Sequence, residues 1–238
     1  MNPLVPYRIF PCGDHAITLE LGNKVDESIN RQIISLFKSI SLQPIHGIKD
    51  IIPAYNSLTI IYDVVIIKKN DQVNTAYGYM EKYLDSAFVN STIANQETPK
   101  QIRIPVCYDV SLAPEISSLA TIHQISVEEV IRLHSSKKYR VYMIGFLPGF
   151  AYMGTVDEKL ITPRKATPRV FVPAGTVGIA GEQTGIYPFD SPGGWQLIGQ
   201  TPLSMFSVEK ELACLLQPGD EVRFYPISIS EFENLKKL

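Results

Sequence analysis

The sequence predicts an α+β protein in two parts, a small layer of strands and helices followed by a larger domain of short strands. Three observations support this prediction. Strand-like and helix-like segments alternate over residues 7–88. A polar stretch, 90–101, is nearly free of large apolar residues and is typical of a linker. Glycine and proline are concentrated between Gly145 and Thr201, which favours short strands joined by tight turns, as in a barrel or sandwich.

The first part is predicted to contain two strand pairs, each followed by a helix. Alternating and β-branched apolar residues place the strands at 7–10, 16–21, 48–53 and 57–62. A helix begins near Asp26 and carries one apolar face, formed by Ile29, Ile33, Leu36, Phe37 and Ile40. A second helix is expected over about residues 72–88 from the helical spacing of Val73, Tyr77, Met80 and Leu84. The order ββαββα predicts helices that cover one face of a sheet.

The second part is predicted to be mainly β-structure after two helices. A strand at 102–108 is followed by a helix from about Ala113. A further helix begins at Ser126, because Ser126 and Glu129 have the spacing of a capping box. From Tyr139 short strands alternate with glycine and proline turns, up to a last strand at 221–225. We therefore expect domains at 1–92 and 93–238.

Composition narrows the classes of function. The 238 residues carry a net charge of −2 and are 45% hydrophobic, which leaves no basic footprint for nucleic acid and enough apolar content for a core. Three scattered cysteines form no C-x-x-C pair, so neither a disulfide framework nor a metal site is expected. No signal-peptide pattern and no apolar run of membrane-spanning length is present, which favours a cytoplasmic protein.

Two arginines near the turn-rich region are the first candidates for chemistry. Thr162-Pro163-Arg164 is echoed by Thr167-Pro168-Arg169, and each guanidinium is a planar fork that suits a carboxylate or phosphate. On one straight strand the two side chains would point to opposite faces, so they can converge only if Lys165-Ala166 turns. The alternative is two surface arginines that flank a loop.

The segments 181–188 and 191–196 offer amide, hydroxyl and backbone N–H groups with few charges. Successive N–H groups in a glycine-rich turn can bind an anion. These segments supply the remaining candidates for a substrate or anion site: Gln183, Tyr187, Ser191, Gly193, Gly194, Trp195 and Gln196. A role as a core anchor is the alternative for Trp195. His134 is a possible further site residue, although a histidine at a predicted helix end also stabilises the helix dipole.

An aromatic and proline-rich segment is the candidate partner interface, because exposed apolar patches mark interaction sites. Its members are Phe146, Pro148, Phe150 and Tyr152. The chain contains no nucleophile elbow, no H-E-x-x-H motif and no standard nucleotide-binding glycine pattern. The catalytic residues are therefore unknown, and we expect the isolated chain to be inactive until a partner completes the active surface.

Several strings resemble the KipI / allophanate hydrolase subunit 1 family over nearly the whole chain. The dense part of the resemblance consists of Leu133-His134-Ser135, 139–154 (YRVYMIGFLPGFAYMG), Thr162-Pro163-Arg164, 172–181 (VPAGTVGIAG), 183–188 (QTGIYP) and 191–199 (SPGGWQLIG). The opening Gly13-Asp14-x-Ala16 and the strand 104–108 (IPVCY) also look like the family. Residues 109–115 (DVSLAPE) depart from its pattern, because they keep a proline and an acidic residue but lose two glycines, which weakens a ligand role for this loop.

The resemblance implies a small α/β N-terminal domain followed by a cyclophilin-like β-barrel. It also implies a subunit of a bacterial ATP-dependent 5-oxoprolinase, which opens 5-oxoproline to L-glutamate with a subunit 2 (KipA/PxpC-like) protein and a PxpA-type subunit. ATP then binds to the complex, in a subunit that the resemblance does not identify. The alternatives are a regulatory protein that inhibits a sensor histidine kinase and a carboxyltransferase-like subunit acting on urea or allophanate.

Overall fold

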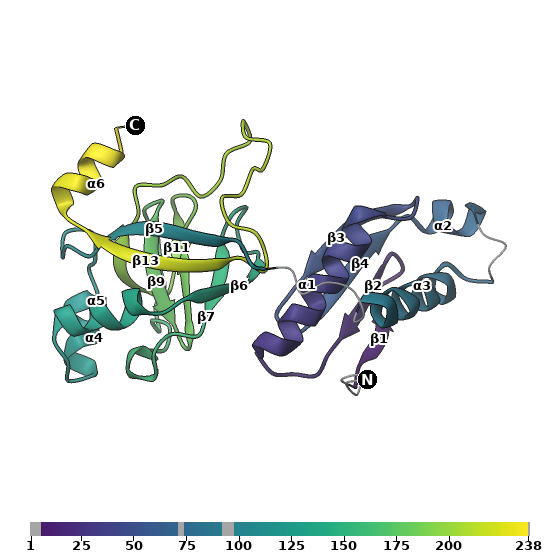
Figure 1. Ribbon diagram of the computed structural model, residues 1–238, viewed down its shortest axis with the longest axis horizontal. Helices are drawn as coiled ribbons and strands as arrows, with labels where there is room; N and C mark the ends of the chain where they lie inside the picture. The colour runs from purple at the N-terminus through teal and green to yellow at the C-terminus, as the bar shows by residue number, and fades with distance from the viewer. Residues whose placement is uncertain (1–5, 71–73, 92–97, 238) are drawn as a thin grey trace. The chain divides into compact units, whose positions relative to one another are not determined.

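The computed structural model describes residues 6–70, 74–91 and 98–237. The chain divides into two compact units, Met1–Thr98 and Pro99–Leu238 (Figure 1). Each unit has its own hydrophobic core, so each is considered separately. The domain bounds expected from the sequence, 1–92 and 93–238, stay a prediction.

The first unit is an antiparallel sheet covered by helices. Its strands follow the order β1-β2-β4-β3, with β1 at Arg8–Pro11, β2 at Ala16–Glu20, β4 at Ser57–Tyr62 and β3 at Ile48–Pro53. Helix α1 (Glu27–Leu42) packs on β3 and β4, whereas α3 (Ala76–Ser91) packs on β1 and β2 and against α1. Both helices therefore lie on one face of the sheet, as the sequence predicts.

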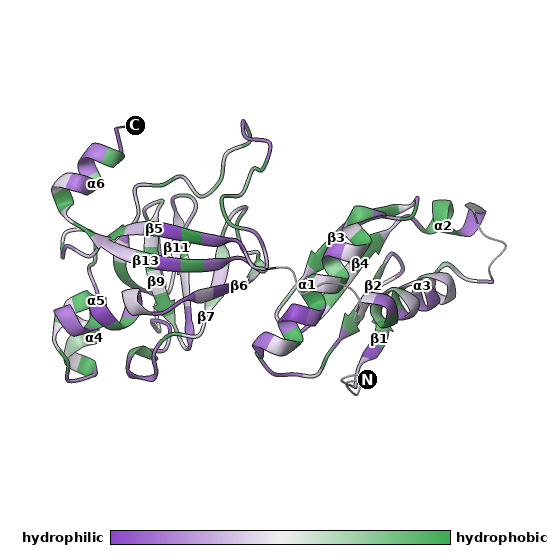
Figure 2. Cartoon of the chain, in the orientation of Figure 1, coloured by the Kyte–Doolittle hydropathy of each residue, from purple (hydrophilic) through white to green (hydrophobic). Residues whose placement is uncertain are grey.

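Helix α1 forms for the reasons visible in its sequence. The Asp26 carboxylate accepts hydrogen bonds from the N–H groups of Ser28 (2.8 Å) and Ile29 (3.1 Å), which satisfies donors that have no partner inside the helix. Apolar and polar residues alternate along the helix (Figure 2), and Ile33, Leu36 and Ile40 are buried in the core. The apolar stripe thus fixes which side of α1 meets the sheet.

The structure adds one helix that the sequence pattern does not indicate. Residues Val64–Asn70 form α2, although the β-branched run from Val64 to Ile67 favours a strand by propensity. Asp63 decides the outcome, because its carboxylate accepts from the N–H groups of Val65 (3.0 Å) and Ile66 (3.1 Å). Burial of Ile67 in the core completes the helix. The predicted helix at 72–88 corresponds to α3, and residues 72 and 73 of that prediction lie outside the described residues.

The second unit is a closed barrel with strand order β10-β7-β6-β13-β5-β12-β9. The barrel strands are β5 (Gln101–Cys107), β6 (Tyr139–Ile144), β7 (Ala151–Gly154), β9 (Thr176–Ala180), β10 (Gln183–Ile186), β12 (Gln196–Gln200) and β13 (Glu221–Ile227). Strands β5 and β13 run parallel, and the other neighbours are antiparallel. The α+β prediction, with a barrel in its second part, is confirmed.

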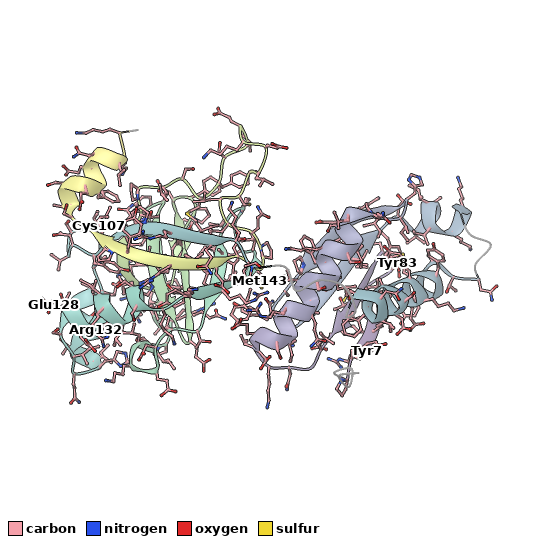
Figure 3. All side chains as sticks on the ribbon, viewed as in Figure 1. Tyr7, Tyr83, Cys107, Glu128, Arg132 and Met143 are labelled. Carbon is pink, nitrogen blue, oxygen red and sulfur yellow. The ribbon has the colours of Figure 1, made fainter. Side chains whose placement is uncertain are left out.

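Helices and a small extra sheet surround the barrel. The helices are α4 (Ile116–Ile122), α5 (Val127–Ser136), a short 3-10 helix η1 (Glu158–Leu160) and α6 (Ile229–Leu235). The extra sheet pairs β8 (Arg169–Val172) with β11 (Ser191–Gly193). Ser126 Oγ accepts from the Glu129 N–H at the start of α5, whereas the Glu129 carboxylate pairs with the exposed Arg132, which is labelled in Figure 3. The barrel interior and the inner faces of α4 and α5 form one apolar core.

Candidate functional site

The segment Thr162–Arg169, which we name the arginine loop, is fastened to the barrel by its backbone. Gly181 donates its N–H to the Thr162 carbonyl at 2.7 Å. Gln196 Nε2 donates to the Pro163 carbonyl at 2.9 Å, and the Lys165 N–H donates to the Gly194 carbonyl at 2.8 Å. The arginine loop therefore rests on the glycine-rich turn 191–196, and two segments that the sequence singled out separately form one surface.

Arg164 is the exposed cation of this surface. Its guanidinium carbon lies 5.9 Å from the centroid of the Trp195 ring, within reach of a cation–π interaction. The carbonyl before it and the N–H after it are both hydrogen-bonded, so the backbone on each side of Arg164 is held. An arginine with a fixed backbone and an exposed planar fork is suited to bind a carboxylate or phosphate.

Arg169 has a different environment, because its guanidinium pairs with the buried carboxylate of Glu115. Lys165 Nζ lies 3.5 Å from the same carboxylate oxygen. The chain bends at residues 166–167, and the two arginines meet different partners. Glu115 was not among the site residues expected from the sequence. The one feature that could have indicated it is the acidic residue kept in loop 109–115, which otherwise departs from the family pattern.

An aromatic cluster lies beneath the arginine loop. Phe150 is its centre, with ring centroids 4.8 Å from Tyr152, 5.3 Å from Tyr187 and 5.3 Å from Trp195. Gly185 makes this possible, because a Cβ there would lie 3.0 Å from both the Phe150 and Trp195 rings. Trp195 is buried, so it serves as a core anchor whose ring also meets Arg164.

Burial and the two arginines have opposite effects on the pKa of the Tyr187 hydroxyl. Burial raises the pKa of Tyr187, whereas a backbone hydrogen bond from Trp195 and the charges of Arg164 and Arg169 lower it. Burial likewise raises the pKa of Tyr152, and the Arg164 charge opposes that effect. The surface is therefore electropositive around two phenol groups that stay protonated at neutral pH.

The remaining sequence-predicted candidates take structural or lining positions. Gln183 is half-buried on β10, opposite Gly154 and Ala180. Gly193 packs against the Tyr187 hydroxyl so closely that no larger residue fits. The Gly194 carbonyl accepts the hydrogen bond from the Lys165 N–H of the arginine loop. Ser191 is buried opposite Val172, and its Oγ has no hydrogen-bond partner within the described residues.

The candidate partner segment separates into exposed and buried members. Phe146 is 62% exposed and adopts a left-handed backbone with φ of 67°, which is unusual for a bulky residue. Pro148 is exposed beside it, and Tyr152 is half-buried. Phe150 is only 1% exposed, because it forms the centre of the aromatic cluster. The surface available to a partner therefore centres on Phe146 and Pro148.

His134 lies inside the second unit, away from solvent. Its Nδ1 lies 2.7 Å from the Tyr108 hydroxyl, its Nε2 lies 2.9 Å from Thr184 Oγ1, and its ring stacks on Phe224. Thr184 donates to the Gly178 carbonyl, so its oxygen accepts from Nε2–H and Tyr108 donates to Nδ1. Burial lowers the pKa of His134 from 6.5 to about 3, and the imidazole is neutral.

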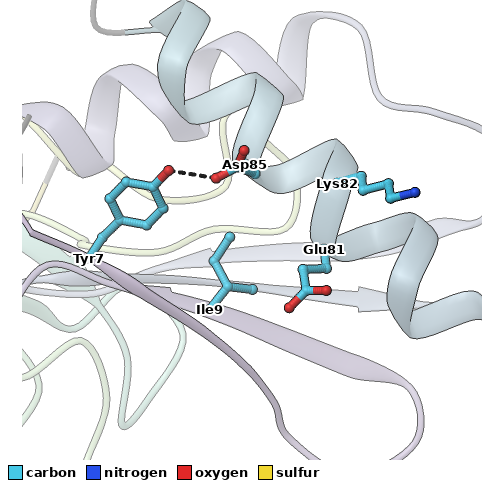
Figure 4. Close-up of a pocket in the computed structure, with 5 residues that line it drawn as sticks. All are labelled: Tyr7, Ile9, Glu81, Lys82 and Asp85. Atoms are coloured by element: carbon cyan, nitrogen blue, oxygen red, sulfur yellow. Dashed lines mark hydrogen bonds between the residues drawn. The ribbon is translucent and has the colours of Figure 1, made fainter.

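A separate cavity of about 350 Å³ occurs in the first unit (Figure 4). It is lined by Tyr7, Ile9, Glu81, Lys82 and Asp85. The Tyr7 hydroxyl donates to the Asp85 carboxylate at 2.5 Å, and this bond raises the pKa of Tyr7. The bond connects the start of β1 to α3, and we interpret the cavity as a surface depression between these two elements.

Neither a membrane-spanning helix nor a metal site is found in the part of the chain that the structure describes. None of its helices combines the length and the hydropathy that a membrane span needs. No group of three or more His, Cys, Asp or Glu side chains there could hold a metal ion.

The fold and the surface together define a class. It combines a helix-covered antiparallel sheet with a closed barrel whose glycine-rich turn holds the arginine loop. The chain belongs to the family described as carboxyltransferase domain, subdomain C and D, whose model matches residues 7–216. The resemblance seen in the sequence is thereby confirmed.

The relatives are more specific. The chain is 37% identical over 235 residues to the 5-oxoprolinase B subunit of Bacillus subtilis (strain 168), covering 98% of each chain. It is also 37% identical over 219 residues to the 5-oxoprolinase B subunit of Escherichia coli O157:H7, covering 92% of this chain and 95% of that one. By contrast, it is 27% identical to the urea amidolyase of Lachancea kluyveri and spans only 14% of it.

Solved structures show the same fold. The chain matches the crystal structure of TTHA0988 with a TM-score of 0.78 and 35% identity, covering 90% of this chain. It spans only 40% of TTHA0988, so that protein joins the module to further sequence. PH0987 from Pyrococcus horikoshii matches at 41% identity and a TM-score of 0.55, covering 94% of this chain and 100% of that one.

Proposed function

We propose that this protein is the B subunit of an ATP-dependent 5-oxoprolinase, which converts 5-oxoproline, ATP and water to L-glutamate. The observation that carries the proposal is the match of 37% identity over 98% of both chains to a 5-oxoprolinase B subunit. That match covers nearly the whole of both chains, whereas the match to the urea amidolyase covers only 14% of that protein. The urea or allophanate alternative is therefore the weaker one.

The surface described above supports this function chemically. A lactam is an unreactive amide, so its opening near neutral pH requires activation, which explains a requirement for ATP. 5-Oxoproline and ATP each carry anionic groups, and Arg164 is the cation placed to bind one of them through a planar fork. Trp195 and Tyr152 form the wall beneath it, with Gln196 holding the backbone.

A partner would complete this surface, which among the described residues shows no paired acid and base ready for catalysis. His134 is buried and neutral, and both phenols keep raised pKa values from burial. A subunit 2 protein would supply the missing groups, with a PxpA-type subunit completing the reaction and ATP bound by the complex. Phe146, displayed on a left-handed backbone, is the proposed anchor for that partner.

The test is reconstitution. The chain is co-expressed with a subunit 2 protein and a PxpA-type subunit from the same genome, and glutamate release from 5-oxoproline is measured with and without ATP. We expect turnover only from the full set with ATP, and none from this chain alone. A folded complex that releases no glutamate would contradict the proposal. Inhibition of a sensor kinase by the chain alone would favour the regulatory alternative instead.

A further inference from the structure

We propose that Glu115 is a positioning residue that holds the arginine loop so that Arg164 stays over Trp195 to bind the anionic group of the substrate. The inference rests on the proposed function, because it concerns how the anion-binding cation of that site is placed. Glu115 does not reach the exposed face of the loop. It acts through two other side chains, those of Lys165 and Arg169.

Glu115 is itself fixed to the barrel. It lies immediately before α4 and is 6% exposed. Its N–H donates to the Leu197 carbonyl at 3.0 Å, and its Oε2 accepts from the Leu197 N–H at 2.9 Å. Backbone and side chain of one residue thus bind the same position of β12, which leaves the carboxylate little freedom to move.

The other carboxylate oxygen holds both sides of the bend in the arginine loop. Oε1 pairs with Arg169 after the bend and lies 3.5 Å from Lys165 Nζ before it. The side chains of Arg169 and Lys165 are 25% and 35% exposed, so water and salt weaken the attraction within this cluster less than they weaken a surface ion pair. Arg169 Nη1 is buried and has no hydrogen-bond partner within the described residues, so the loss of Glu115 would remove the ion-pair partner of a partly buried guanidinium.

The position of Arg164 depends on these contacts, because Lys165 is the next residue in the chain. The Pro163 carbonyl and the Lys165 N–H are held by the glycine-rich turn, and Glu115 holds the Lys165 side chain. Among the described residues, Arg164 has no carboxylate within ion-pair distance, unlike Arg169. The loop therefore uses one arginine to anchor itself and leaves the other for a ligand.

The first experiment uses the isolated chain and needs no activity. Glu115→Gln keeps an oxygen acceptor for the Leu197 N–H and nearly the same volume, but removes the charge. Trypsin cleaves after Arg164 and Lys165 only when the loop opens, so we expect at least about tenfold faster cleavage at these sites, read by mass spectrometry. Trp195, the only tryptophan of the chain, should also change its emission. Glu233→Gln, at an exposed glutamate of α6, is the matched control.

A second pair of variants guards against simple misfolding. Glu115→Asp keeps the charge on a shorter side chain, and should restore part of the protection against trypsin. Glu115→Gln combined with Arg169→Gln removes both charges of the buried pair, so cleavage after Lys165 should be slower than in Glu115→Gln alone. Wild-type cleavage rates in a folded Glu115→Gln protein would overturn the proposal.

The second experiment uses the reconstituted complex and separates the two hypotheses. We expect Glu115→Gln to raise KM for the anionic substrate about tenfold or more with a smaller change in kcat, because Arg164 is displaced rather than removed. If Arg164→Ala lowers turnover but Glu115→Gln does not, the proposed site stands and the positioning role is wrong. If Arg164→Ala leaves turnover unchanged, the anion site itself is wrong, and Glu115 has nothing to position.

Discussion

Tyr108 and His134 are hydrogen-bonded in the interior of the second unit, with 2.7 Å between the phenol oxygen and Nδ1. Thr184 occupies the other ring nitrogen, and Phe224 stacks on the ring face. Only a neutral imidazole satisfies the whole network, because a protonated Nδ1 would donate to the Tyr108 oxygen and leave the Tyr108 O–H without an acceptor within the described residues. His134 is therefore part of the scaffold that carries the arginine loop.

The first prediction concerns acid stability. The pKa of His134 is lowered by burial from 6.5 to about 3, so the unfolded chain binds a proton that the folded chain does not. Stability is then fully present above pH 6.5 and is lost as the pH falls toward 3. From pH 7 to pH 5 we expect a loss of about 2 kcal/mol in the free energy of unfolding, measured with urea.

Direct titration checks the assignment to His134. Its imidazole resonances should not shift between pH 7 and pH 5, whereas a solvated histidine titrates in that range. In His134→Gln the dependence of stability on pH should become flatter over the same interval. Protonation of His134 above pH 5 would contradict the prediction.

The second prediction separates the two arginines. Arg164→Ala should weaken substrate handling by about tenfold to a hundredfold, because a charge-assisted hydrogen bond contributes roughly 1.5–3 kcal/mol. Arg164→Lys should rescue only partly, since an ammonium lacks the bidentate fork. The melting temperature should hardly change, because Arg164 is exposed. The measurement is kcat/KM in the reconstituted complex.

Arg132→Ala is the control, because Arg132 is an exposed arginine of α5 paired only with Glu129 within the described residues. It should change neither kcat/KM nor stability beyond about 0.5 kcal/mol. A lowered melting temperature with normal kcat/KM in Arg164→Ala would show that the arginine only staples the loop.

The third prediction concerns the partner surface. Phe146→Asp should abolish co-purification with the subunit 2 protein while the chain stays folded, because its ring is exposed. Phe150→Asp should instead unfold the second unit, since it places an unpaired carboxylate at the centre of the aromatic cluster, at a penalty of several kcal/mol. Affinity pull-down and thermal melting distinguish the two. A folded Phe146→Asp protein that still binds would move the interface elsewhere.

The fourth prediction tests the packing of the aromatic cluster. Gly185→Ala places a Cβ 3.0 Å from the rings of Phe150 and Trp195 and 3.1 Å from the Ala151 carbonyl. We expect a loss of about 1–3 kcal/mol, together with a changed Trp195 emission. Gly194→Ala is the control, because its nearest neighbour is Pro168 Cγ at an ordinary 3.6 Å. Equal stability of the two variants would show that the cluster adjusts freely.

Most helices and strands could be predicted from the sequence, because the signals that mark them are local. Asp26 and Ser126 mark the starts of α1 and α5 by accepting bonds from N–H groups two or three residues on. Period-2 alternation indicated β2 and β4, and the glycine- and proline-rich run indicated short strands and tight turns between Gly145 and Thr201. Helix α2 was missed because a β-branched run obscured the cap at Asp63.

The surroundings of each candidate residue could not be predicted from the sequence, because they depend on contacts between distant segments. Arg164 and Arg169 both follow a Thr-Pro pair, yet Glu115, distant in the chain, pairs with Arg169 and leaves Arg164 exposed. Phe146 and Phe150 look alike in the sequence, yet in the folded barrel Phe150 is buried and Phe146 is exposed. Residue patterns report the neighbours along a strand or helix, whereas burial and ion pairing depend on which remote segments the closed barrel brings together.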